Sequence, residues 1–304
     1  RVAGAEAAYL GGTPGIGQRA LRRQDQMAAV GGTDHAPYLR QVEITGTAAG
    51  GDGIDHALGA AVVPIDVENF GLWLKAAFGG PTTTGTTPKT HTFQSGNWSL
   101  PSMAIETGMP EVPRYAMYTG CVCDQLSWQM SRSGLLTATA RLVAQGENAA
   151  SATAAGTTTA LGLQRFGHFN GSITRNGTPL GNVISAEVTY SNGLDRIETI
   201  RADGKIEGAD PGMASLTGRM EVRFADMALI TQALDGTPCE LVFAYSLGAS
   251  ASFTFTAHAV YLPRPRIEIP GPQGIQATFD WQAAKATSPA RMCTAVLVNT
   301  TTSY

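Results

Sequence analysis

Short segments in which apolar and polar residues alternate dominate this 304-residue chain. Polar and apolar residues alternate strictly over Arg219–Phe224, and they alternate over most of Val183–Tyr190 and Ser252–Tyr261. Successive side chains of a β-strand point to opposite faces, so each segment indicates a strand with one buried face. The pair Asn176-Gly177 suits a tight hairpin turn, because both residues tolerate positive φ. The pattern predicts a mainly β fold.

Two segments are predicted to be helical. The first runs from Asn69, as N-cap, to a stop at Gly79, and the second runs from Asp226, as N-cap, to a stop at Gly236. Their apolar faces are Phe70, Trp73 and Ala77 in the first, and Met227, Ile230 and Leu234 in the second. The distance from cap to stop is the same in both, which suggests an internal duplication.

Two long hairpins support the duplication. The first consists of Leu126–Met130, a turn, and Leu136–Ala144, and the second consists of Pro265–Ile269, a turn, and Ile275–Ala283. The hairpins lie 139 positions apart and keep the same inward phase, so Trp128 corresponds to Ile267 and Leu142 to Trp281. The two helices lie 157 positions apart, and the first copy therefore carries 18 extra residues. We expect them in the low-complexity loop 79–90.

The chain is accordingly divided into four parts. We expect an extended N-terminal arm over 1–38, a first domain over 39–146, a flexible Ala/Thr/Gly-rich linker over 147–162 and a second domain over 163–304. Each domain is predicted to be a β-sandwich or barrel with one short flanking α-helix. We expect no signal segment, and no apolar run approaches the ~18–20 residues that span a bilayer.

The charge content limits the classes of function. Charged residues make up 15% of the chain, against roughly 25% in an ordinary soluble domain. Because interface cores are depleted of charge, this favours a surface buried against copies of the same chain. An unusually Thr/Ser/Gly/Ala-rich monomer is the alternative. The net charge of −3 argues against a protein that binds nucleic acid tightly.

The sequence shows no motif that indicates catalysis. The stretch 11–17 is Gly-rich but lacks the ending of a phosphate-binding loop, so it is interpreted as part of a flexible arm. Asp52, Asp55 and His56 lie in a Gly-rich stretch and are expected in an exposed loop. The four cysteines, Cys121, Cys123, Cys239 and Cys293, are predicted to be buried thiols and not zinc ligands. We predict no enzyme activity, no cofactor and no metal.

The polar faces of the two hairpins carry mostly neutral hydrogen-bonding groups. A solvent-exposed face normally mixes Lys and Glu freely, whereas these residues suit the wall of a wet channel. The candidate channel-lining residues are Gln125, Ser127, Gln129, Thr137, Thr139, Gln276, Thr278, Asp280 and Gln282. An ordinary solvated sheet face is the alternative.

Three segments of the first half, 98–108, 118–127 and 134–146, resemble major tail tube proteins of long-tailed, siphovirus-like bacteriophages. Residues 218–299 resemble the matching tube domain. The resemblance implies β-sandwich tube domains with a flanking helix, whose subunits close into a ring through a continuous inner β-barrel. It implies that the rings stack around a tape-measure protein into a virion tail, which is assembled in the host cytoplasm and later ejects the genome.

The partners follow from the same resemblance. They are other copies of the chain, the tape-measure protein, and the tail-terminator and tail-tip proteins, while DNA passes without specific binding. The family implies six tube domains per ring, so two domains per chain favour a trimer with pseudo-sixfold symmetry over a hexamer. The alternatives are a tail-tip or baseplate ring protein of the same fold and a carbohydrate-binding β-sandwich. The latter would expose aromatic residues, whereas Trp128 and Trp281 occupy apolar positions that indicate the core.

Overall fold

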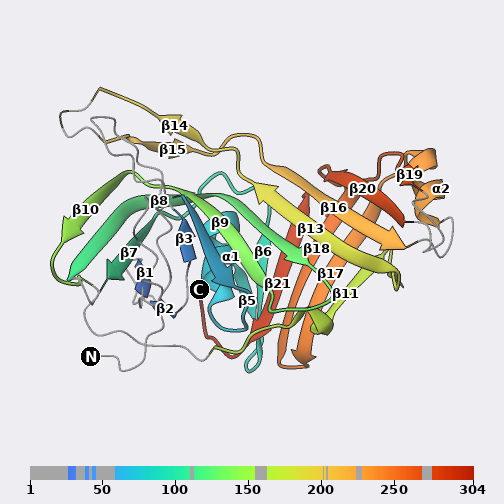
Figure 1. Cartoon of the computed structure of the whole chain (residues 1–304), viewed down its shortest axis with the longest axis horizontal. Helices are drawn as coiled ribbons and strands as arrows, with labels where there is room; N and C mark the ends of the chain where they lie inside the picture. The colour runs from blue at the N-terminus through green and yellow to red at the C-terminus, as the bar shows by residue number, and fades with distance from the viewer. Residues whose placement is uncertain are drawn as a thin grey trace, which may run out of the picture.

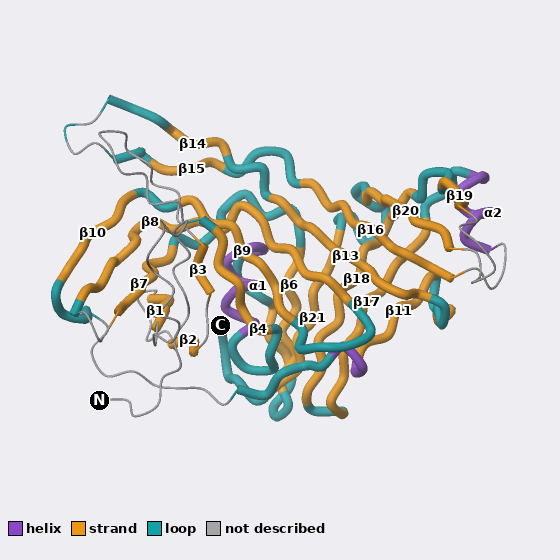
Figure 2. The backbone as a smooth tube through the Cα atoms, viewed as in Figure 1, coloured by secondary structure: helices purple, strands orange, loops and turns teal. Residues whose placement is uncertain are grey.

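The computed structural model describes residues 59–109, 113–154, 163–200, 202, 205–223, 228–268 and 276–304, together with the backbone of three strands between 27 and 45. Within these residues the chain is mainly β, with 21 strands and two α-helices. The molecule is elongated along the horizontal axis of Figure 1. Strands fill most of this length, and the helical segments, purple in Figure 2, are short. The predicted fold class is confirmed.

Two sheets form a sandwich, and all their pairings are antiparallel. The central sheet consists, in order, of β3 (Glu43–Thr45), β4 (Ala60–Pro64), β9 (Thr137–Val143), β8 (Arg114–Met130), β13 (Val183–Ser191), β16 (Ser215–Arg223), β20 (Gln276–Ala283) and β19 (Arg266–Glu268). The covering sheet consists of β12 (Thr178–Pro179), β11 (Gly171–Arg175), β17 (Cys239–Gly248), β18 (Ala251–Tyr261), β21 (Cys293–Asn299), β6 (Lys89–Gln94) and β5 (Thr82–Thr84).

A side sheet extends the molecule beyond the sandwich. Its strands are β2 (Tyr38–Arg40), β1 (Met27–Gly31), β7 (Met103–Met109), the first half of β8, and β10 (Gly146–Ala150). At 17 residues, β8 is long enough to belong to both the side sheet and the central sheet. A separate hairpin, β14 (Asp195–Ile197) with β15 (Gly208–Asp210), projects from the same end (Figure 1). A short 3₁₀ turn, η1, spans His168–Asn170.

The core lies between the central and covering sheets. Alternate residues of β13, Ala186, Val188 and Tyr190, are buried, as period two requires. Trp128 and Trp281 are both buried, which confirms that they face inward. Trp128 packs edge-to-face on Phe255 with ring centroids 4.8 Å apart. The buried apolar side chains of both halves of the chain form one cluster, so the two halves share a core.

Both predicted helices are present, as α1 (Phe70–Phe78) and α2 (Ala228–Asp235). The following glycines, Gly79 and Gly236, have φ of 87° and 64°, which explains why each helix stops there. Asn69 is the N-cap residue of α1, as predicted, but its side chain makes no capping hydrogen bond. Its backbone N–H and its side-chain amide both donate to the buried Asp66 carboxylate, at 3.0 and 2.6 Å, so the side chain is held by Asp66 and not by the helix. The expected cap Asp226 lies outside the described residues.

The strand pairings of the second half repeat those of the first. β1–β2 and β1–β7 recur as β11–β12 and β11–β17, and β3–β4 and β4–β9 recur as β13–β16 and β16–β20. β7–β8 and β8–β10 recur as β17–β18 and β18–β21, and β8–β9 recurs as β19–β20. The register recurs as well, because Trp128 pairs with Ala138, and Ile267 pairs with Ala277 139 positions later. This order is what a duplication produces. The domain bounds 39–146 and 163–304 remain a prediction.

Three segments differ from expectation. The predicted arm includes β1 and the start of β2, whose backbones pair within the side sheet. The predicted linker begins with β10, because residues 147–150 pair with β8. The expected loop 79–90 contains β5 and the start of β6, and β6 pairs with β21 of the second half. In each case a low-complexity stretch completes an open sheet edge. The rest of the arm and linker lies largely outside the described residues.

His91 lies in a polar cluster that holds the C-terminal residues. It is fully buried, and its Nε2 lies 3.1 Å from both Asn299 Oδ1 and the Thr301 carbonyl oxygen. Both partners are acceptors, so Nε2 carries the proton and Nδ1 accepts from the Thr83 hydroxyl at 2.9 Å. Burial lowers the pKa of His91, and the nearby charge of Lys89 adds to this.

Acid is therefore expected to destabilise the fold through His91. In the unfolded chain its pKa is about 6.5, so below this pH the unfolded state takes up a proton that the folded state disfavours. The contribution to stability is complete above pH ~6.5 and is lost as the pH falls toward the lowered pKa. His91→Gln, which keeps an N–H donor, should show a smaller loss of unfolding free energy between pH 7 and 5 in urea titrations. Equal losses in both proteins would contradict this role.

All four cysteines are free and buried, as predicted. Burial raises the pKa of Cys121, Cys123 and Cys293 to about 12, and that of Cys239 to about 11. Because the thiolate is the reactive form, these thiols are chemically protected. Among the described residues no three His, Cys, Asp or Glu side chains gather as metal ligands. Neither described helix is long and apolar enough to cross a membrane.

Candidate functional site

The nine candidate channel residues lie on one face of the central sheet. They are half-buried or exposed, while residues that alternate with them, such as Leu126, Ala138 and Phe279, are buried in the core. They come from β8, β9 and β20, which belong to one sheet although 139 positions separate the hairpins. The structure therefore brings together the whole predicted set. We call this surface the polar face.

The sequence did not reveal that two further strands lie between the hairpins in the sheet. β13 pairs with β8 and β16 pairs with β20, so both insert into the middle of the polar face. Their outward residues add Ser185, Glu187, Thr189, Ser191, Ser215, Thr217, Arg219, Glu221 and Arg223. Their alternation was recognisable in the sequence, but a local pattern does not say which distant strand is the neighbour.

The strand register arranges the side chains in rows across the sheet. One row is made of neutral groups from five adjacent strands: Thr139, Ser127, Thr189, Thr217 and Gln282. The next row joins Gln129 to the charged residues Glu187, Arg219 and Asp280. Opposite charges alternate along this second row, as favourable cross-strand pairs do.

The polar face is close to electrically neutral. Its outward charged residues on β9, β13, β16 and β20 are three arginines, Arg141, Arg219 and Arg223, and three acids, Glu187, Glu221 and Asp280. Arg219 Nε lies 3.8 Å from Asp280 Oδ1, with both side chains well exposed. An exposed pair of this kind contributes little stability. The carboxylate of Asp280 does, however, neutralise the charge of Arg219, so Arg219 is not an unpaired cation that would bind phosphate.

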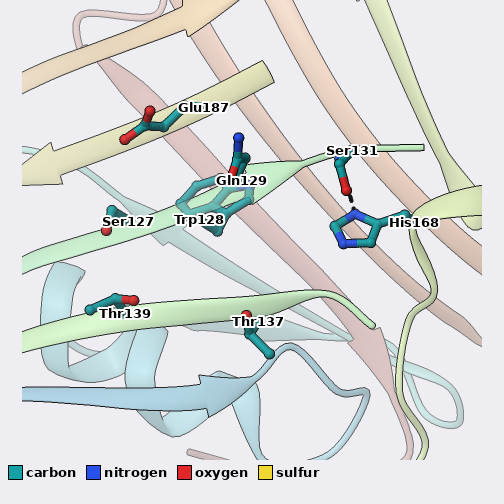
Figure 3. Close-up of a pocket in the computed structure, with 8 residues that line it drawn as sticks. All are labelled: Ser127, Trp128, Gln129, Ser131, Thr137, Thr139, His168 and Glu187. Carbon is teal, nitrogen blue, oxygen red and sulfur yellow. Dashed lines mark hydrogen bonds between the residues drawn. The ribbon is translucent and has the colours of Figure 1, made fainter. Parts of the chain in front are cut away.

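A polar hollow of about 330 Å³ lies at the edge of this face. Figure 3 shows its lining, which includes Ser127, Thr137, Thr139 and Glu187 from three strands and His168 from the facing loop. The Ser131 backbone N–H donates to His168 Nδ1 at 3.2 Å, which fixes the imidazole beside the β8–β9 turn. Burial lowers the pKa of His168. His168 was not among the predicted site residues, because the five histidines are scattered along the sequence.

The hydrogen-bonding groups of the polar face are distributed over a wide surface and are not gathered at one point. Hydroxyl and amide groups spread over five strands can hydrate a broad surface. A β-sandwich with one extended polar face is typical of a structural protein. A family model described as phage tail tube protein matches residues 3–283, so the chain belongs to this family and is a structural component of the virion tail. No curated protein matches the sequence.

Proposed function

We propose that the chain is the major tail tube subunit, that three copies close into a ring, and that the rings stack around a channel for the genome. Membership of the tail tube family implies self-assembly. The observation that carries the proposal is the joint between the halves, where β8 of the first half pairs with β13 of the second half. It continues the central sheet from one repeat into the next.

The repeat also indicates how a ring would close. β19 corresponds to the end of β8, and β3 corresponds to β13, because their pairings with β20 and β4 match. If β3 of the next chain lies beside β19 as β13 lies beside β8, the sheet continues from chain to chain. A contact between two different surfaces of this kind generates a closed ring when the rotation from one chain to the next closes. Closure also covers strand edges that would otherwise promote aggregation.

The polar face is the surface of the central sheet available to the channel, since the opposite face is filled by the core. Phosphates bind arrays of Lys and Arg strongly, and such binding would hold DNA in the channel. A wall of hydroxyls, amides and balanced charges avoids this. The tape-measure protein would occupy the channel during assembly in the host cytoplasm, and terminator and tip proteins would cover the tube ends.

A labelling experiment tests the position of the polar face. Thr139→Cys places a thiol on this face, and Thr256→Cys places a matched thiol on the outer side of the covering sheet; both positions are half-buried. The native thiols are buried and unreactive, so they give no background. We expect assembly to protect Cys at 139, but not at 256, from a large maleimide-polyethylene glycol, while a small maleimide reacts with both. Protection of 256 in place of 139 would reverse the assignment.

A further inference from the structure

The two helices occupy corresponding places in the repeat, but only α1 is covered. At the 157-position offset Trp73 corresponds to Ile230, and both are buried. Ala77 corresponds to Leu234, and here the helices differ, because Ala77 is 0% exposed and Leu234 is 59% exposed. The sequence pattern places Leu234 on the buried face of its helix. A large apolar side chain exposed at such a position indicates a missing partner.

The second half of the chain covers α1. Phe78 packs on Tyr190 of β13 with ring centroids 4.5 Å apart, and Phe70 packs on Phe253 of β18 at 5.2 Å. The Asn192 side chain, which follows β13, donates to the Ala77 carbonyl oxygen at 3.0 Å. Part of the contact that buries α1 is thus made by the repeat that comes next in the chain, in addition to β8 and β6 of its own half.

For α2 no later repeat exists within the chain as described. The helix lies at one end of the molecule, whereas α1 lies near the middle (Figure 1). Cys239, which begins the strand after α2, pairs with Val260. The next residue, Tyr261, is 45% exposed although the other odd-numbered residues of β18 are buried. Leu234 and Tyr261 are thus two exposed apolar side chains of the second half, and we refer to them together as the α2 rim.

The complementary surface is found in the first half. β18 is a strand of the second half that packs on α1. Its counterpart in the first half is the beginning of β8, where Ala116 corresponds to Phe255 and Tyr118 to Ala257. The pairings match, because Ala116 lies between Thr107 and Ala149 as Phe255 lies between Phe243 and Ala295. Phe255 and Ala257 are fully buried, whereas Ala116 and Tyr118 are only half-buried. The first repeat thus lacks a cover at the place where the second repeat receives α1.

We propose that the α2 rim docks on the first half of β8, around Ala116 and Tyr118, of a second copy of this chain. The contact between chains then repeats the contact between the two halves of one chain. The inference rests on the proposed ring and names the side chains that join its subunits. The occupant is a second copy, because both surfaces are present on each chain and correspond to surfaces that are already in contact within it.

Leu234→Arg tests the rim. Its side chain is largely exposed, so the variant should keep the wild-type far-UV circular dichroism and melting temperature. We expect rings to require at least a tenfold higher chain concentration in mass photometry, because the charged group must be desolvated at the interface. Ala116→Arg should have the same effect from the other side. Leu135→Arg is the matched control, since Leu135 is 55% exposed in the β8–β9 turn, and it should form rings like the wild type.

The outcomes separate this inference from the proposed function. Rings of Leu234→Arg at the wild-type concentration would overturn the docking surface and leave the tube intact as a proposal. Loss of rings in Leu234→Arg but not in Ala116→Arg would overturn the receiving surface on β8. Loss in the Leu135→Arg control as well would show that any surface arginine blocks assembly, and it would overturn the assignment to α2. A wild-type chain that stays monomeric at every concentration would overturn both the ring and the rim.

Discussion

Replacing Trp281 by alanine is expected to lower the free energy of unfolding by about 3–5 kcal/mol, the range for removing a buried large aromatic side chain. Trp281 is 2% exposed and stacks on Phe243 with ring centroids 6.1 Å apart. Its ring also lies over Gly218 of the neighbouring strand, where a Cβ would come within 2.3 Å of Trp281 Cζ2. Because Gly218 has no side chain to move into the space, the cavity cannot be filled from that side.

Urea unfolding followed by far-UV circular dichroism measures this effect, with Trp98→Ala as the matched control. Trp98 is 75% exposed, so its loss should change stability by less than about 0.5 kcal/mol. Trp281→Phe should cost less than Trp281→Ala, because it keeps an aromatic ring and the buried indole N–H makes no hydrogen bond to another side chain or backbone group in this structure. Equal costs at positions 98 and 281 would mean that Trp281 does not support the shared core.

Local patterns were sufficient to predict several elements of this fold. Alternation located β13, β16 and β18, and cap-to-stop spacing located α1 and α2. The turn at Asn176-Gly177 has φ of 48° and 78°, as a two-residue hairpin requires. The N-cap position of Asn69 was predictable, but the absence of a capping bond from its side chain was not, because that side chain bonds to the Asp66 carboxylate instead. Local signals therefore specify elements more reliably than they specify which polar residue serves each end.

The arrangement of the strands could not be predicted from local patterns. The pairing of β8 with β13 joins Trp128 to Val188, and the pairing of β6 with β21 joins His91 to Leu297. No residue pattern in either segment identifies the strand with which it pairs. Side-chain period alone also could not show that β8 leaves one sheet and enters another within a single strand. The candidate channel residues were predictable because alternation fixes which face a residue occupies, whichever strand lies beside it.

Native mass spectrometry of the smallest closed assembly is expected to find three chains of 31.7 kDa each, about 95 kDa in total. Each chain contributes two copies of the strand–helix–hairpin order, so three chains supply the six tube domains that the family resemblance implies. In a closed ring every interface must match the next. The matched registers of β8–β9 and β19–β20 meet this condition, since both ends of the chain then present equivalent edges.

The symmetry of that ring should be threefold and only approximately sixfold. The first half contains the hairpin β5–β6, which pairs with β21 of the second half and has no counterpart in the second half of the chain as described. Three of the six joints would therefore carry this extra pair of strands, and the three joints between chains would lack it. The joints between chains should be the weaker ones, so mild denaturant should release intact single chains before the halves separate. A reconstruction without imposed symmetry distinguishes the two kinds of joint. Six chains per ring, each giving one domain to the barrel, would contradict the trimer, because the second repeat would then have no place in the wall.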